Sequence, residues 1–104
     1  MQFDVYVNTD KDTNNTYPYF IDIQSPLLDS LNSRAVIPLT PAKKASKSYP
    51  KNLCPNVEIS RKDYVLLTHQ ITSVPLGLLK NKKAALQSNR TEIIDAIDFL
   101  VTGI

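Results

Sequence analysis

One segment of this 104-residue chain has the periodicity of an amphipathic helix, residues 89–104, and no other stretch shares that pattern. At about 100° per residue its apolar side chains fall within an arc of roughly 160°. They are Ile93, Ile94, Ala96, Ile97, Leu100, Val101 and Ile104. This arc is wider than one small sheet covers, and Phe99 stands on the opposite face among carboxylates. We therefore expect the helix to meet a second surface, such as a symmetry mate or a target protein.

The other apolar stretches are short, and most alternate with a period of two, which is typical of half-buried strands. Residues 2–7 and 17–24 predict two strands that pair antiparallel around the polar loop 8–16. Residues 34–39 predict a third strand, which Pro38 bends or confines to a sheet edge. Three more strands are predicted at residues 57–59, 64–71 and 73–79.

The connecting segments carry most of the basic residues. Residues 40–52 predict a long loop with a run of lysines, which is most simply solvated and otherwise a contact for an acidic partner. Residues 80–86 predict a basic linker. Ser88 or Asn89 caps the final helix, and with Asn89 as the cap Glu92 takes the third helical position and completes a capping box.

Leu27 and Leu28 follow Ser25 and Pro26, so this apolar pair lies in a turn rather than in a regular element. Two interpretations are open. The simpler one is that the loop tucks both side chains under the edge of the sheet, and the other is that they form an exposed contact patch.

About six strands followed by one helix predict a single, mainly β domain over residues 1–104, a small bent antiparallel sheet or barrel with the helix across it. The chain has two glycines and seven prolines, so prolines must make many of the bends. Residues 1–20 do not resemble a signal peptide, and no apolar run approaches the ~20 residues that span a bilayer. We expect a cytoplasmic protein without a membrane segment.

The residues that could carry chemistry are few. Cys54 is the one cysteine, which excludes an internal disulfide, and we expect it to be buried as a small apolar side chain. His69 is the one histidine, and its strand parity with Leu67 and Ile71 predicts a structural role. Asp95 and Asp98 share a helix face that is most simply solvated. Without a triad, metal cluster or phosphate loop, the sequence predicts a binding protein with no cofactor.

Five short motifs, in order and spacing, resemble the CcdB family, the toxins of bacterial toxin–antitoxin pairs. The motifs are residues 1–6 (MQFDVY), 20–25 (FIDIQS), 34–39 (RAVIPL), 72–75 (TSVP) and 93–104 with the closing Gly-Ile. Each motif alone is weak, but the five run nearly end to end, which makes the signal specific. The resemblance implies a homodimer of SH3-like barrels, each with an inserted small sheet and a C-terminal α-helix.

The resemblance also implies a function. The family's toxin binds the A subunit of DNA gyrase and traps the enzyme on cleaved DNA, which is inhibition by binding and needs no catalytic residue. A CcdA-like antitoxin releases the toxin from gyrase and represses the shared operon with it, so that DNA is reached only through that complex. The positions that the resemblance assigns to gyrase binding are Leu27, Leu28, Asp98, Val101, Thr102, Gly103 and Ile104.

The sequence departs from the family pattern at Thr102, where the best-known plasmid-borne members have a tryptophan. Two alternatives to gyrase inhibition stay open, and only the first depends on Thr102. The first is an attenuated relative that binds antitoxin only, because an aromatic ring at an interface is often a hot spot. The second is an endoribonuclease, because RNA-cutting toxins share this barrel as an analogy of fold. For that chemistry the candidates are His69, Arg34 and Arg61.

Overall fold

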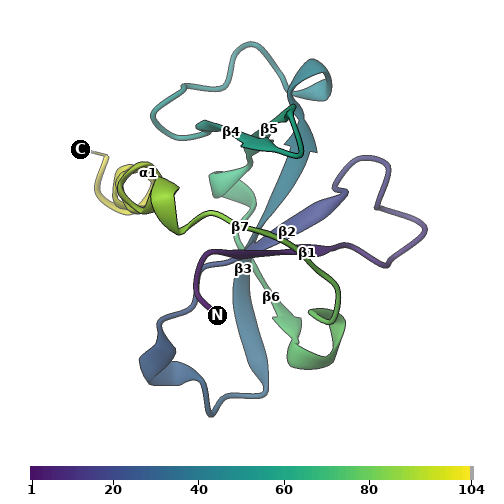
Figure 1. Ribbon diagram of the computed structural model, residues 1–104. Coiled ribbons are helices and arrows are strands. Elements are labelled where there is room, and N and C mark those ends of the chain that lie inside the picture. Colours follow the sequence, from purple (N-terminus) through teal and green to yellow (C-terminus); the bar gives the residue numbers. More distant parts are fainter. Residues whose placement is uncertain (104) are drawn as a thin grey trace.

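The computed structural model describes residues 1–103 and shows a strongly curled antiparallel sheet with one α-helix beside it (Figure 1). This half-barrel with a C-terminal helix confirms the predicted fold class. The strands are β1 (Asp4–Val7), β2 (Tyr19–Asp22), β3 (Ser33–Pro41), β4 (Asn56–Ile59), β5 (Lys62–Leu66), β6 (Thr72–Pro75) and β7 (Lys82–Ala85), and the helix is α1 (Arg90–Thr102).

The sheet follows the order β4-β5-β3-β2-β1-β7, and β6 pairs with β3 outside this path. The predicted hairpin of β1 and β2 is confirmed, with Val5 opposite Ile21. Strands β4 and β5 form a second hairpin that projects from the end of β3 (Figure 1). Its two-residue turn has positive φ at Ser60 and Arg61, the conformation that matches the twist of a tight hairpin.

Strand β3 runs through Pro38 and is central in the sheet, so the prediction that Pro38 confines the strand to a sheet edge was wrong. The strand pairs with β2 on one side, and on the other side with β6 near its start and β5 near its end. Alternate residues of a strand turn their backbone groups to opposite sides. The Pro38 carbonyl oxygen accepts the Leu67 N–H at 3.0 Å, so the backbone groups of Pro38 face away from β2. They face the point where β6 ends at Val36 and β5 begins at Leu39, and a missing N–H costs no ladder bond there.

Three other predicted boundaries were wrong because the sheet pairing decides where strands begin and end. β5 stops at Leu66, where β3 changes its partner, and a 3₁₀ helix, Thr68–Gln70, follows. β6 stops at Pro75, opposite the start of β3 at Ser33. The predicted linker 80–86 contains strand β7, which pairs with β1 through Val5 and Ala84.

Helix α1 buries only part of its apolar arc against its own sheet. Ile93 and Ala96 are fully buried, and Ile94 and Ile97 pack partly on the core. Asn89 is the N-cap residue of α1, as predicted, but the predicted capping box was wrong, because the Asn89 side chain makes no capping hydrogen bond. Its φ and ψ of −97° and 12° lie outside the β region typical of a capping residue, and its Nδ2 donates to Glu92 Oε1 at 3.3 Å instead.

The main core lies between the concave side of the sheet and α1. Its buried members are Phe3, Val5, Ile21, Ile37, Leu39, Val57, Ile59, Tyr64, Leu66, Leu86 and Ile93. A smaller cluster of Cys54, Val65 and Leu67 lies under the loop that precedes β4. The predicted burial of Cys54 is therefore confirmed.

Candidate protein-binding surfaces

Leu27 and Leu28 lie in a short 3₁₀ helix, Pro26–Leu28, and both side chains face solvent. Leu27 is 92% exposed and Leu28 is 48% exposed, so the interpretation that they tuck under the sheet was wrong. Pro26 starts the turn, and the Ser25 hydroxyl accepts a hydrogen bond from the Leu27 N–H at 3.2 Å. The structure therefore places two leucines in water on a well-formed turn.

A buried polar network lies directly behind this turn. Arg34 donates through Nε and Nη2 to Asp22 Oδ2 at 3.2 and 2.6 Å, and through Nη1 to Asp29 Oδ1 at 2.7 Å. The hydrogen bond to Asp22 first, and then the one to Asp29, raise the pKa of the Arg34 guanidinium above its ordinary value. Gln24, also buried, donates to the Leu28 carbonyl oxygen at 2.9 Å.

Sequence reasoning missed this network because it treated Asp22 and Gln24 only as members of the predicted strand 17–24 and gave neither a buried partner. Both side chains are buried in the structure, as is Arg34. The available signal was Arg34 itself, a charged residue that opens an otherwise apolar strand and so needs carboxylates nearby.

The last turn of α1 forms the second candidate surface. Val101 is 76% exposed, and Asp98 and Thr102 are exposed beside it. The Thr102 hydroxyl donates to the Asp98 carbonyl oxygen at 2.7 Å. Gly103 ends the helix with φ +74°, a left-handed conformation that suits glycine, and its N–H donates to the Phe99 carbonyl oxygen at 2.8 Å. Ile104, the seventh predicted contact, lies outside the described residues.

A single chain does not bring these two surfaces together. In Figure 1 the turn with Leu27 and Leu28 lies between β2 and β3, below the N-terminus, and the end of α1 lies well above it. Leu27 and Val101 thus belong to two separate exposed apolar patches on one protomer.

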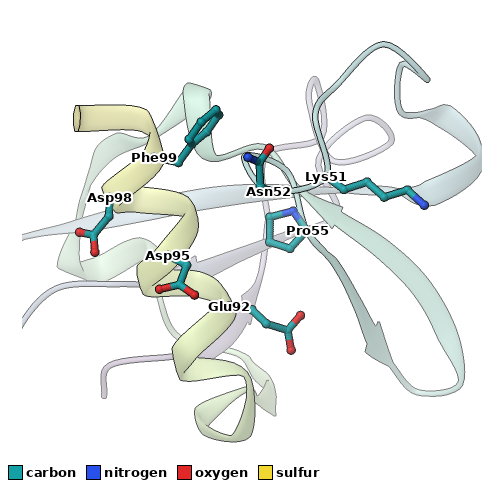
Figure 2. Close-up of a pocket in the computed structure, with 7 residues that line it drawn as sticks. All are labelled: Lys51, Asn52, Pro55, Glu92, Asp95, Asp98 and Phe99. Carbon is teal, nitrogen blue, oxygen red and sulfur yellow. The ribbon is translucent and has the colours of Figure 1, made fainter. Parts of the chain in front are cut away.

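A groove of about 390 Å³ separates α1 from the loop that precedes β4 (Figure 2). The helix contributes its carboxylate face and Phe99, and the loop contributes three residues: Lys51, Asn52 and Pro55. Figure 2 shows the Phe99 ring on the Asn52 side of the helix, while the Asp98 carboxylate points away from Lys51. Phe99 is half-buried there, which gives this ring among carboxylates a local packing role.

The three candidates for RNA cleavage do not form one site. Arg34 is buried and bonded to two carboxylates, and Arg61 is exposed in the β4–β5 turn. His69 lies in the 3₁₀ helix after β5, with its ring against Tyr49 and its Nδ1 atom 3.5 Å from Cys54 Sγ. Burial raises the pKa of the Cys54 thiol, and a backbone hydrogen bond from Thr68 partly opposes this.

The loop of lysines contacts the other long polar loop. Lys44 Nζ donates to the Asn15 carbonyl oxygen at 2.9 Å, which links the segment after β3 to the loop between β1 and β2. Residues 1–103 contain no group of three His, Cys, Asp or Glu side chains placed to hold a metal ion. No helix in the described part of the chain is long and apolar enough to cross a membrane.

The fold and its surfaces define a class: a small half-barrel with a C-terminal helix, which exposes large apolar side chains at the Pro26–Leu28 turn and at the end of α1. Comparison with known protein families identifies the family within this class. The family model described as CcdB protein matches residues 2–103, which is nearly the whole chain. The chain therefore belongs to the CcdB family, and it is a toxin of the toxin–antitoxin class.

Proposed function

We propose that this chain is a toxin that binds the A subunit of DNA gyrase and traps the gyrase–DNA cleavage complex in the cytoplasm. It acts by binding and has no catalytic residue of its own. A CcdA-like antitoxin neutralises it and represses the shared operon with it. The proposal is supported by the family match over residues 2–103.

The observation that best supports the proposed gyrase contacts is the solvent exposure of their side chains. The resemblance assigns gyrase binding to two separate stretches, and each presents an apolar side chain to water: Leu27 at 92% and Val101 at 76% exposed. Isolated exposed leucines are ordinary on protein surfaces. An assigned contact position that is nearly fully exposed, on a turn held by a buried network, supports a surface for a protein partner.

Dimerisation accounts for the separation of the two patches. Leu100, which lies on the apolar arc of α1 and is not an assigned gyrase contact, is 37% exposed, so part of this arc is available for a second copy. A homodimer repeats each patch about its two-fold axis, and a large partner such as gyrase can then contact patches from both protomers. We therefore include the homodimer in the proposal.

The decisive experiment measures binding to purified gyrase A subunit together with inhibition of supercoiling. Val101→Lys places a charge on the helix-end surface while remaining compatible with a helix C-terminus. Thr91→Glu is the matched control, because it adds one charge of the favourable sign at the other, exposed end of α1. We expect Val101→Lys to abolish binding and inhibition, and Thr91→Glu to retain both.

Two results would separate the alternatives. Wild-type protein that fails to bind gyrase, and that leaves cells without antitoxin growing normally, would identify the attenuated relative. Cleavage of RNA that is lost in His69→Ala would identify the endoribonuclease, which we do not expect because Arg34 is bonded to Asp22 and Asp29.

A further inference from the structure

The turn that displays Leu27 and Leu28 is held from beneath by two buried side chains, Gln24 and Arg34. Gln24 Nε2 donates to the Leu28 carbonyl oxygen at 2.9 Å, and Arg34 Nη1 donates to Asp29 Oδ1 at 2.7 Å. These bonds fix the last residue of the 3₁₀ helix and the residue that caps it. The two exposed leucines therefore stand on a backbone anchored at its C-terminal end.

The same two side chains are also fixed within the sheet. Gln24 Oε1 accepts the Ala35 N–H at 2.9 Å, and the Gln24 N–H donates to Asp22 Oδ1 at 3.0 Å. Asp22 Oδ2 in turn accepts two bonds from Arg34. The result is a closed ring of hydrogen bonds that runs from Arg34 through Asp29 and the turn to Gln24, and back through Asp22.

This ring explains how Leu27 stays in water. A turn held only by its own backbone is free to fold an apolar side chain back onto nearby apolar surface, which hydrophobic burial favours. Here exposed leucines stand close by in the sequence at Leu28 and Leu31, yet Leu27 remains 92% exposed. The anchored backbone keeps the side chain outward.

We propose that Asp29, held by Arg34, is a positioning residue that presets this turn, so that Leu27 and Leu28 meet the partner protein without ordering during binding. Surfaces that are already ordered bind more tightly because less conformational entropy is lost. The inference rests on the proposed gyrase contact. It adds to that contact a residue whose carboxylate acts through the turn rather than on the partner.

Asp29→Asn tests this role with the least disturbance to the core. The Asp29 side chain is 60% exposed, and Asp22 still neutralises Arg34 in the variant. We expect the global unfolding midpoint to be nearly unchanged and affinity for gyrase A subunit to fall about tenfold. The amides of Leu28 and Leu31, which donate to Ser25 and Leu28 carbonyl oxygens, should exchange several-fold faster with solvent.

Two further variants serve as controls for Asp29→Asn. Asp63→Asn is the matched control, because Asp63 is an exposed carboxylate on β5 that is bonded to no part of the turn among residues 1–103. It should change neither amide exchange at the turn nor affinity. Asp29→Glu restores a carboxylate for Arg34 and should recover part of the lost affinity, which a variant that merely disturbed the surface would not do.

Asparagine keeps a side-chain oxygen that accepts a weaker, uncharged hydrogen bond, whereas alanine removes the acceptor for Arg34. Unchanged amide exchange in both Asp29→Asn and Asp29→Ala would overturn the inference regardless of affinity. Faster exchange with affinity within about twofold of wild type would also overturn it, provided that Leu27→Ala loses binding, and the gyrase contact would then stand. If Leu27→Ala and Leu28→Ala both bind normally, the gyrase contact itself is refuted, and the role of Asp29 in binding falls with it.

Discussion

Truncating Leu27 to alanine tests the proposed gyrase surface most directly, because the side chain has almost no contact to lose within its own fold. It is 92% exposed, and surface changes of this kind alter the free energy of unfolding by about 0.5 kcal/mol or less. Its removal in Leu27→Ala should therefore appear in binding alone. A loss of stability would show that the turn had been described wrongly.

The expected loss of affinity follows from the exposed fraction of each leucine side chain. The change from leucine to alanine removes three carbon groups, each worth about 0.8 kcal/mol when buried, so complete burial of Leu27 by a partner is worth about 2.4 kcal/mol. At about 1.4 kcal/mol per factor of ten, the dissociation constant should rise about 50-fold. Leu28 is 48% exposed and has about half as much area to bury, so Leu28→Ala should cost about sevenfold.

Calorimetric titration of gyrase A subunit with each variant measures these values, and denaturant unfolding of the same samples measures stability. Leu31→Ala is the matched control, because Leu31 has the same exposed fraction as Leu28 in the same loop but is not an assigned contact. It should bind as wild type does. A Leu27→Ala protein within about twofold of wild type, or a larger loss for Leu28→Ala than for Leu27→Ala, would refute the reasoning from exposure.

Three other changes have expected outcomes. Thr102→Trp, on an exposed position, should tighten gyrase binding about 30-fold without shifting the melting temperature, and no gain in titration would show that the helix end is not the interface centre. Ile93→Ala removes a fully buried side chain and should lower the free energy of unfolding by about 2–5 kcal/mol in urea, whereas a loss under 1 kcal/mol would contradict the described core. Asp4 is buried, which raises the pKa of its carboxyl, but bonds from Gln87 and Lys82 outweigh this and lower it. The stability that the Asp4 carboxylate contributes is therefore present above about pH 4 and is lost as the pH falls through the lowered pKa. Denaturant titrations of Asp4→Asn should show a smaller loss of stability on acidification than those of the wild type. An equal loss in both proteins would contradict this assignment.

Local periodicity is enough to predict much of the fold. The alternation in residues 2–7 and 17–24 predicted a hairpin, and the 3.6-residue repeat predicted the terminal helix, because the side-chain direction along one element depends only on its own backbone. The resemblance in the motifs also placed the chain in the CcdB family, which the family match confirms. It named the exposed Leu27 and Val101 as contacts, and that role stays a prediction.

What the sequence could not determine is which neighbour each strand meets. A proline such as Pro38 is typical of a strand end, yet it is tolerated within the central strand because β6 ends and β5 begins beside it. The basic composition of residues 80–86 indicates a linker, yet this stretch supplies strand β7, which pairs with β1. Both outcomes depend on residues far away in the sequence, and no local pattern encodes them.

The candidate surfaces divide in the same way. The sequence by itself determined that Leu27 and Leu28 lie in a turn, because Ser25 and Pro26 start one through local backbone chemistry. Only the tertiary structure decided that the turn faces water and is held by Gln24 and Arg34, because Arg34 comes from the next strand. A buried charge is stable only beside groups of opposite charge, and the antiparallel pairing of β2 with β3 brings Asp22 to Arg34.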